Sequence, residues 1–227
     1  MSTKQENPGP QAAVSPERTQ ASSITKRIVE AVAGRARNGD PVRVLGLTGP
    51  PGTGKSTIAA ELANALPEAG LAVAGMAPMD GFHMSNALLA ARGLADHKGA
   101  PDTFDVGGYV ALLGRVRRAD GVVLAPDYRR DLHEPVAASL PVEVDGVVIT
   151  EGNYLGLELP GWADVRGLID LLVYIDTPFE ELASRLIDRH VSFGRDRSDA
   201  AHWVRTVDAA NRSEERRVGK ECVSTCR

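Results

Sequence analysis

The residues Gly49 to Thr57, GPPGTGKST, have the types and spacing of a phosphate-binding loop, because they match G-x-x-x-x-G-K-[ST] at every required position. In this pattern backbone N–H groups turn inward around phosphate oxygens, Lys55 reaches the terminal phosphates, and the Ser56 hydroxyl ligates Mg²⁺. The sequence therefore predicts a nucleotide-binding protein. The predicted nucleotide-binding residues are Gly49, Pro50, Pro51, Gly52, Thr53, Gly54, Lys55, Ser56 and Thr57.

Two carboxylates follow apolar runs that are typical of buried strands. Asp80 follows the run 71–78, and Glu151 follows the run 147–150. In parallel α/β sheets the chemistry lies at the carboxyl ends of the strands, so both side chains should lie near the terminal phosphate of the nucleotide. Asp80 could accept the proton of an attacking hydroxyl, and Glu151 could support Mg²⁺ together with Ser56. A turn or helix-cap role for Asp80 stays open.

Charged and aromatic residues near these strand ends are candidates for contacts with a phosphoryl acceptor. A solvated charged loop is the simpler interpretation of segment 126–135. The predicted substrate-binding residues are His83, Lys98, Tyr128, Arg130, His133, Glu151 and Asn153.

The helix expected over 179–191 ends in Arg185 and Arg189, and Arg195 follows it, so arginines cluster at this end. Arg189 and Arg195 flank Gly194, a candidate hinge, and arginines so placed can close as a lid over a transferring phosphoryl group. Alternatively they only complement the partial negative charge at the helix C-terminus.

The apolar pattern predicts alternating strands and helices, with Asp145-Gly146 as a hairpin turn between two of the strands. We expect an α/β chain with the three-layer P-loop NTPase fold, in which helices flank a mostly parallel sheet. The expected strands are 44–48, 71–78, 122–125, 142–144, 147–150 and 168–175, and the expected helices are 23–37, 58–65, 85–92, 106–119, 179–191 and 199–211.

Composition narrows the class of protein. The chain has 227 residues, of which 43% are hydrophobic, and this suits one domain of ordinary size. Its net charge of −4 gives no electrostatic reason to expect nucleic acid or an anionic membrane as a partner. The sequence has no apolar run near the roughly 18 residues of a membrane span and no signal peptide, so we expect a cytoplasmic protein.

The two ends of the chain differ from the rest in composition. Residues 1–22 are rich in Pro, Ser, Gln and Ala, so a disordered leader is expected before a P-loop domain over 23–211. Residues 212–227 are expected to be non-native, because Arg212–Cys222 resembles the translation of a sequencing adapter. A solvated helix end is the alternative. Both cysteines, Cys222 and Cys226, lie in this tail, so no disulfide or metal site is predicted.

Seven motifs together resemble one group of P-loop kinases: GPPGTGKST, MDGFH, HKGAPDTFD, DYRRDLHEP, TEGNYL, DTP and RLIDRHVSFGRD. In this order and spacing they are similar to uridine kinase, phosphoribulokinase and bacterial pantothenate kinase, and most similar to the bacterial nucleoside/nucleotide kinase family proteins with fructose-kinase-like members. The resemblance covers about residues 25–211. It implies Asp80 as catalytic base, Lys55 and Ser56 on phosphates and Mg²⁺, Glu151 on the metal or the acceptor, and Arg189 and Arg195 in the lid.

The expected activity is ATP- and Mg²⁺-dependent transfer of the γ-phosphoryl group to an alcohol hydroxyl of a small metabolite, such as a nucleoside, a sugar or a pantothenate-like compound. A neutral, polyhydroxylated acceptor fits the predicted contacts best.

A GTPase is disfavoured because the chain lacks an Asn-Lys-x-Asp motif, and an ATPase because Glu151-Gly152 stands where an Asp-Glu pair is expected. An inactive nucleotide-binding protein, truncated after Asn211, is the third alternative. The sequence is compatible with a homodimer.

Overall fold

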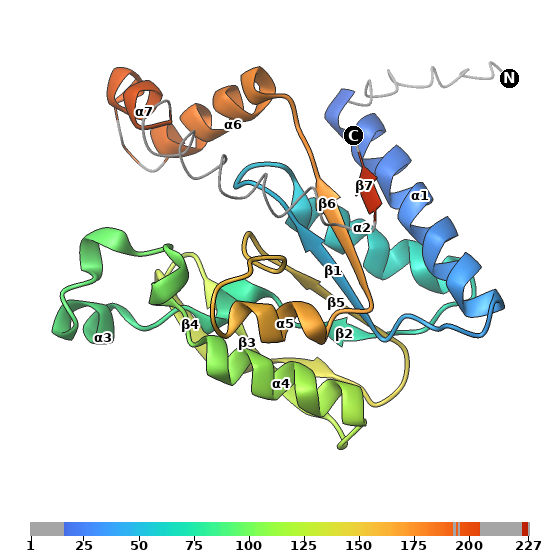
Figure 1. Cartoon of the computed structure of the whole chain (residues 1–227). Coiled ribbons are helices and arrows are strands. Elements are labelled where there is room, and N and C mark those ends of the chain that lie inside the picture. The colour runs from blue at the N-terminus through green and yellow to red at the C-terminus, as the bar shows by residue number, and fades with distance from the viewer. Residues whose placement is uncertain (1–15, 193, 195, 205–223, 227) are drawn as a thin grey trace, which may run out of the picture.

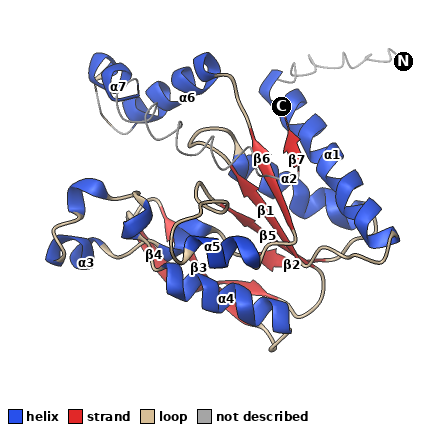
Figure 2. Cartoon of the chain, viewed as in Figure 1, coloured by secondary structure: helices blue, strands red, loops and turns tan. Residues whose placement is uncertain are grey.

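A parallel sheet forms the centre of the computed structural model, which describes residues 16–192, 194, 196–204 and 224–226 (Figure 1). Every neighbouring pair in this sheet is parallel, and the order across it is β2-β5-β1-β6-β7. Parallel strands need long crossover connections, and these place helices on both faces (Figure 2). The strands of the sheet are β1 (Val44–Thr48), β2 (Val73–Met76), β5 (Val147–Glu151), β6 (Leu171–Ile175) and β7 (Ser224–Cys226).

Alternate residues of each central strand contribute to two separate cores. In β5, Val148 packs with α4 (Val106–Arg118) and α5 (Trp162–Gly167), whereas Ile149 packs with α1 (Pro16–Arg37) and α2 (Lys55–Glu68). This alternation is the two-residue period of a strand with both faces buried. The three-layer α/β fold predicted from the sequence is therefore confirmed (Figure 1).

Shorter elements surround the carboxyl edge of the sheet, and α6 and α7 lie beyond the carboxyl ends of β1 and β6 (Figure 1). Among the described residues, no helix combines the length and the apolar character that crossing a bilayer requires. The remaining elements are η1 (Met79–Phe82), α3 (Asn86–Ala91), η2 (Ala95–His97), η3 (Pro101–Thr103), β3 (Val123–Arg129), β4 (Glu134–Val142), α6 (Phe179–Ser192) and α7 (Arg197–Trp203).

The hairpin expected around Asp145-Gly146 is wrong. The antiparallel partner of β4 is β3, with Val123 opposite Val142, and β5 runs parallel to β1 and β2. Much of the segment 126–135, expected to be a solvated loop, is therefore strand. A turn motif sets the local chain direction, but the burial of the first four residues of β5 selects a central place in the parallel sheet.

Several helix boundaries also differ from the prediction. Helix α1 begins at Pro16, inside the segment expected to be a leader, and residues 1–15 lie outside the described residues. Helix α2 continues through Pro67, which lies in its last turn. Helix α5 was not predicted, because six residues are too few for a clear helical period. Residues 205–211 of the last expected helix lie outside the described residues.

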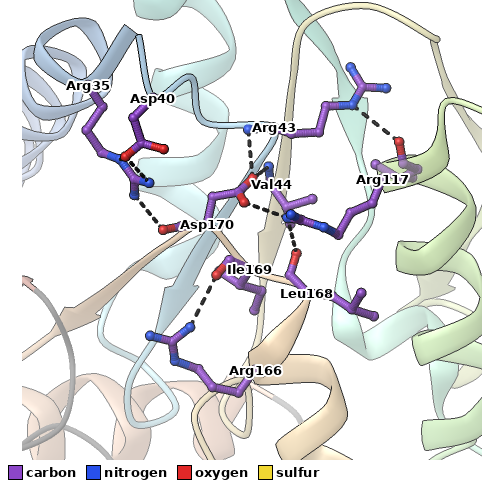
Figure 3. Close-up of polar contacts among 10 residues, drawn as sticks. Arg35, Asp40, Arg43, Val44, Arg117, Arg166, Leu168, Ile169 and Asp170 are labelled. Carbon is purple, nitrogen blue, oxygen red and sulfur yellow. Dashed lines mark hydrogen bonds and ion pairs between the residues drawn. The ribbon is translucent and has the colours of Figure 1, made fainter. Parts of the chain in front are cut away.

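Asp170 joins the amino ends of β1 and β6 (Figure 3). Its Oδ2 accepts hydrogen bonds from the backbone N–H groups of Arg43 and Val44, both at 2.8 Å. Its Oδ1 pairs with the Arg117 guanidinium of α4 at 2.5 Å, and its backbone oxygen accepts from Arg35 of α1. One residue, through its side chain and its backbone oxygen, thus connects two strands to helices on both faces.

We expect Asp170→Ala to lower the free energy of unfolding by about 2–4 kcal/mol, because two backbone N–H groups and one guanidinium lose their acceptor. The shift in the midpoint of urea denaturation measures this loss. Asp120→Ala is the matched control, since Asp120 pairs with Arg118 while both side chains are exposed. That change should cost less than about 1 kcal/mol. Equal losses in the two variants would contradict the structural role of Asp170.

The tail was expected to lie outside the fold, but Ser224–Cys226 forms β7 beside β6, with Thr225 opposite Tyr174. Without β7, β6 would be an edge strand whose unpaired backbone groups can accept any short extended segment. The tail can therefore pair with β6 through its backbone alone, without side chains that are specific for this position.

A chain that ends at Asn211 should melt within about 2 °C of the full chain. Net contributions of about 1 kcal/mol for each backbone hydrogen bond in β7 are offset by the conformational entropy lost when the tail is ordered. A loss of even 1 kcal/mol would lower the melting temperature of a domain of this size by about 2–4 °C. Differential scanning calorimetry of the two chains would detect such a loss. A melting temperature lowered by more than about 2 °C would show that the tail stabilises the sheet.

Candidate active site

The phosphate loop connects β1 to α2 and has the backbone geometry that anion binding requires. Gly49 has φ 145°, and a Cβ there would lie 2.5 Å from the carbonyl oxygen of Ile175, so a larger residue cannot replace it. Thr53 closes the turn by donating its hydroxyl to the Pro50 carbonyl at 2.9 Å. Helix α2 follows Gly54, which has no side chain to cap the first N–H groups of the helix. Those groups remain available for an anionic ligand.

The Lys55 ammonium is held inside this loop, and only 7% of the residue is exposed. Its Nζ donates to the carbonyl oxygens of Gly49 at 2.8 Å and Pro50 at 2.9 Å, and to Oδ1 of Asn153 at 2.8 Å. Asn153 is itself held by Thr48, whose hydroxyl donates to the Asn153 carbonyl. The structure thus brings together Lys55 and Asn153, two residues that the sequence predicted for the site.

Glu151 lies at the carboxyl end of β5, where its Oε1 accepts a hydrogen bond from the Ser56 hydroxyl at 2.9 Å. Burial raises the pKa of the Glu151 carboxyl, and the nearby Asp80 carboxylate adds to the rise, whereas Lys55, Ser56 and Arg130 oppose it.

The oxygens of Ser56 and Glu151 suit Mg²⁺, which prefers hard oxygen ligands and in nucleotide enzymes takes several of them from phosphates and water. Among the described residues, no group of three or more His, Cys, Asp or Glu side chains could hold a metal by itself. Ser56 and Glu151 would supply two oxygen ligands, and phosphate oxygens and water could supply the others.

Asp80 lies in η1, directly after β2 and Pro78, and its side chain is partly exposed. The backbone oxygen of Asp80 accepts hydrogen bonds from the His83 backbone N–H at 3.2 Å and from the His83 ring Nδ1 at 2.8 Å. These bonds hold η1 in a tight turn at the carboxyl edge of the sheet. The position is the one that the rule for parallel sheets predicts for Asp80.

The His83 ring lies between two aromatic rings, with centroid distances of 4.1 Å to Phe104 and 4.9 Å to Tyr128. Burial lowers the pKa of His83, and the Lys98 charge lowers it further, against the opposing influence of Asp80. A carbonyl oxygen can only accept, so Nδ1 carries the hydrogen that is directed at Asp80. In the neutral ring Nε2 is then a hydrogen-bond acceptor.

Lys98 joins the segment before η3 to the β3–β4 hairpin. Its Nζ lies 5.3 Å from the centroid of the Tyr128 ring and donates to the carbonyl oxygen of His133 at 2.7 Å and to Oδ1 of Asn86. The contact with Lys98 therefore comes from the backbone of His133 and not from the imidazole. Arg130 is exposed on the same hairpin, and its charge acts on Glu151.

The two predicted lid residues lie at and beyond the end of α6. Arg189 lies in α6, but its side chain is outside the described part of the structure, and Arg195 lies outside the described residues. Arg185, one turn before Arg189, donates to the Gly52 carbonyl of the phosphate loop at 3.5 Å. Arg185 belongs to the arginine cluster noted in the sequence, but only Arg189 and Arg195 were predicted as lid residues. Arg185 and Arg189 are four residues apart and so lie on one face of the helix. This spacing could have identified Arg185 as a further residue of the site.

Comparison with known proteins assigns the family. "Uncharacterized protein YggC" of Escherichia coli is 38% identical over 171 residues, covering 74% of this chain and 70% of that protein. "Putative uridine kinase C227.14" of Schizosaccharomyces pombe is 35% identical over 161 residues, covering 66% and 67%. The crystal structure of a "putative fructose transport system kinase" from Silicibacter sp. TM1040 matches with a TM-score of 0.77 at 32% identity, covering 90% and 98%. The chain belongs to the uridine kinase-like P-loop kinases.

Membership in this P-loop kinase family confirms the resemblance inferred from the motifs, and the reaction class of the family is phosphoryl transfer. The family model for "Methylmalonyl Co-A mutase-associated GTPase MeaB" also matches, over residues 11–87. That match covers less than half of the chain. It includes the phosphate loop and Asp80, but not Glu151, the β3–β4 hairpin or α6.

Proposed function

We propose that the protein is a Mg²⁺- and ATP-dependent kinase that transfers the γ-phosphoryl group of ATP to an alcohol hydroxyl of a small metabolite. The observation that supports this most directly is the convergence of Lys55, Ser56, Asp80 and Glu151 at the carboxyl edge of one parallel sheet. A phosphate cradle, a metal-binding pair of oxygens and a second carboxylate are the groups that phosphoryl transfer to a hydroxyl needs.

The phosphate loop and its lysine bind the nucleotide. The N–H groups at the start of α2 and the Lys55 ammonium neutralise phosphate oxygens, and Asn153 keeps the ammonium in place. Ser56 and Glu151 would hold Mg²⁺, which when bound neutralises charge on the phosphate oxygens. Arg185 already contacts the loop from α6, which supports the proposal that Arg189 of the same helix and Arg195 beyond it close over the phosphates.

Asp80 is proposed as the general base. As the acceptor hydroxyl oxygen forms its bond to the γ-phosphorus, the bond from that phosphorus to the β,γ-bridging oxygen breaks, and ADP leaves. The hydroxyl proton passes to the Asp80 carboxylate. Glu151 is less suited to this step, because its carboxylate already accepts from Ser56.

A neutral acceptor that carries several hydroxyl groups is proposed, with His83, Lys98, Tyr128, Arg130 and His133 around it. The neutral His83 ring offers Nε2 as an acceptor for a hydroxyl hydrogen, and Tyr128 can bond a second hydroxyl. The names of two relatives point the same way, since uridine and fructose each carry several hydroxyls.

The test is a measurement of ADP formation with purified protein, Mg²⁺ and ATP, in the presence of uridine, fructose, pantothenate or no acceptor. The proposal expects ADP formation that depends on Mg²⁺ and on at least one acceptor, with a phosphorylated product detected by mass spectrometry. The match to a GTPase model over residues 11–87 supports one alternative. Hydrolysis that prefers GTP and is equally fast with and without every acceptor would favour that alternative.

A further inference from the structure

Two buried hydroxyl groups lie beneath the proposed active site. Tyr109 of α4 and Thr150 of β5 are both 0% exposed, and the Tyr109 hydroxyl is hydrogen-bonded to Oγ1 of Thr150. Oγ1 of Thr150 also bonds the carbonyl oxygen of Ala77 at 2.6 Å. A carbonyl oxygen can only accept, so the single hydroxyl hydrogen of Thr150 is directed at Ala77. Tyr109 is therefore the donor to Thr150, and burial raises the pKa of its hydroxyl, which keeps it protonated.

This chain of hydrogen bonds extends the connection between β2 and β5 beyond the end of the backbone ladder. The last ladder bond runs from the Ala77 N–H to the Ile149 carbonyl at 3.0 Å. The next residue, Pro78, has no N–H and cannot continue the ladder. The Thr150 side chain takes over at this point, so the bond from Thr150 to Ala77 is the last polar link between the strands before the two carboxylates.

The two residues joined by this bond, Thr150 and Ala77, are close in sequence to the proposed catalytic carboxylates. Thr150 immediately precedes Glu151, and Ala77 lies three residues before Asp80. The two segments also touch, because a Cβ at Gly152 would lie 2.5 Å from the Cβ of Met79. A displacement of either strand end would therefore change the separation of Asp80 and Glu151.

Tyr109 also contacts the last residue of η1 directly. Its ring packs against that of Phe82, the last residue of η1, with a centroid distance of 4.6 Å. Through Thr150 it acts on Ala77, which precedes η1. Phenylalanine could fill the same space in this core without burying a hydroxyl, so packing alone does not explain the tyrosine.

We propose that Tyr109 is a positioning residue that, through Thr150, sets the separation of Asp80 and Glu151. Tyr109 acts on the reaction only through these groups and does not itself touch the substrate. The proposal rests on the proposed kinase function, because the separation matters for transfer of a phosphoryl group from a metal-bound nucleotide to a hydroxyl.

The test begins with Tyr109→Phe, which keeps the ring and removes the hydroxyl. We expect kcat to fall by about 10- to 100-fold, as for a misplacement of catalytic groups of about 1 Å, while KM for ATP stays within about twofold of wild type. Thr150→Val should behave like Tyr109→Phe, whereas Thr150→Ser keeps the hydroxyl and should retain near-normal kcat. The double variant that combines Tyr109→Phe with Thr150→Val should lose no more than the more severe single variant, because both substitutions remove one shared link.

Val116→Ala is the matched control, since Val116 is buried in the same core two turns further along α4 and has no polar side-chain atom. If it lowers kcat as much as Tyr109→Phe at a similar melting temperature, a general loss of packing explains both effects and the positioning role is wrong. Equal changes in KM and kcat in Tyr109→Phe would also overturn it.

Hydrogen exchange of the peptide 77–83 separates this proposal from the kinase function itself. This peptide contains the bonds from Gly81 to Pro78 and from His83 to Asp80. We expect faster exchange there in Tyr109→Phe than in Val116→Ala. If wild type transfers phosphate to no acceptor, the proposed function fails and the exchange data alone decide the positioning role. Unchanged exchange in Tyr109→Phe would overturn that role even in an active enzyme.

Discussion

Replacing Lys55 with alanine is expected to lower kcat by at least about a thousandfold. The side chain supplies the cation of the phosphate loop, and loss of one preorganised charge at a transferring phosphoryl group removes a large part of the stabilisation of the transition state. Initial rates of ADP formation at saturating ATP and acceptor measure the effect.

The fold should survive this substitution, although Lys55 is more buried than a loop position suggested. Its Nζ bonds two backbone carbonyls of the loop and Asn153, so some local order is lost. We expect the melting temperature to fall by only a few degrees, as for a loss of about 1 kcal/mol. Lys26→Ala, at an exposed position of α1, is the matched control and should keep full activity. A near-normal kcat in Lys55→Ala would remove the basis of the proposed function.

Replacing Asp80 with asparagine is expected to lower kcat by about 10² to 10⁴-fold, because the amide keeps the size of the side chain but cannot take a proton. The dissociation constant of MgATP should barely change, since the phosphates are bound by the loop and the start of α2. Isothermal titration calorimetry of nucleotide binding, beside the rate assay, separates the two effects. Asp145→Asn, a position outside the site, is the control for the same chemical change.

The result for Asp80 also decides between two carboxylates. If Asp80→Asn weakens nucleotide binding in proportion to the rate, Asp80 is a metal or phosphate ligand, and Glu151 becomes the better candidate for the base. We propose the first assignment, in which Asp80 is the base, because the Glu151 carboxylate already accepts a hydrogen bond from the Ser56 hydroxyl. In that place it is better suited to hold a cation than to take a proton from the acceptor.

The sequence by itself determined the parts of the site that depend on contiguous residues or on strand ends. The phosphate loop is one uninterrupted stretch whose backbone geometry follows from its own glycines and from the helix that begins at Lys55. Asp80 and Glu151 could be placed because each follows an apolar strand, and the carboxyl ends of parallel strands meet at one edge. No partner further along the chain had to be known for these inferences.

The tertiary structure alone decided which distant segments meet. The pairing of β3 with β4, the contact of Arg185 with the phosphate loop and the bond between Tyr109 and Thr150 join residues whose own neighbourhoods contain no sign of the partner. Asp145-Gly146 even favoured a different pairing, because a turn motif reports only the local direction of the chain. Such contacts depend on how whole strands and helices bury their apolar faces, and that choice is made by the packed core and not by local spacing.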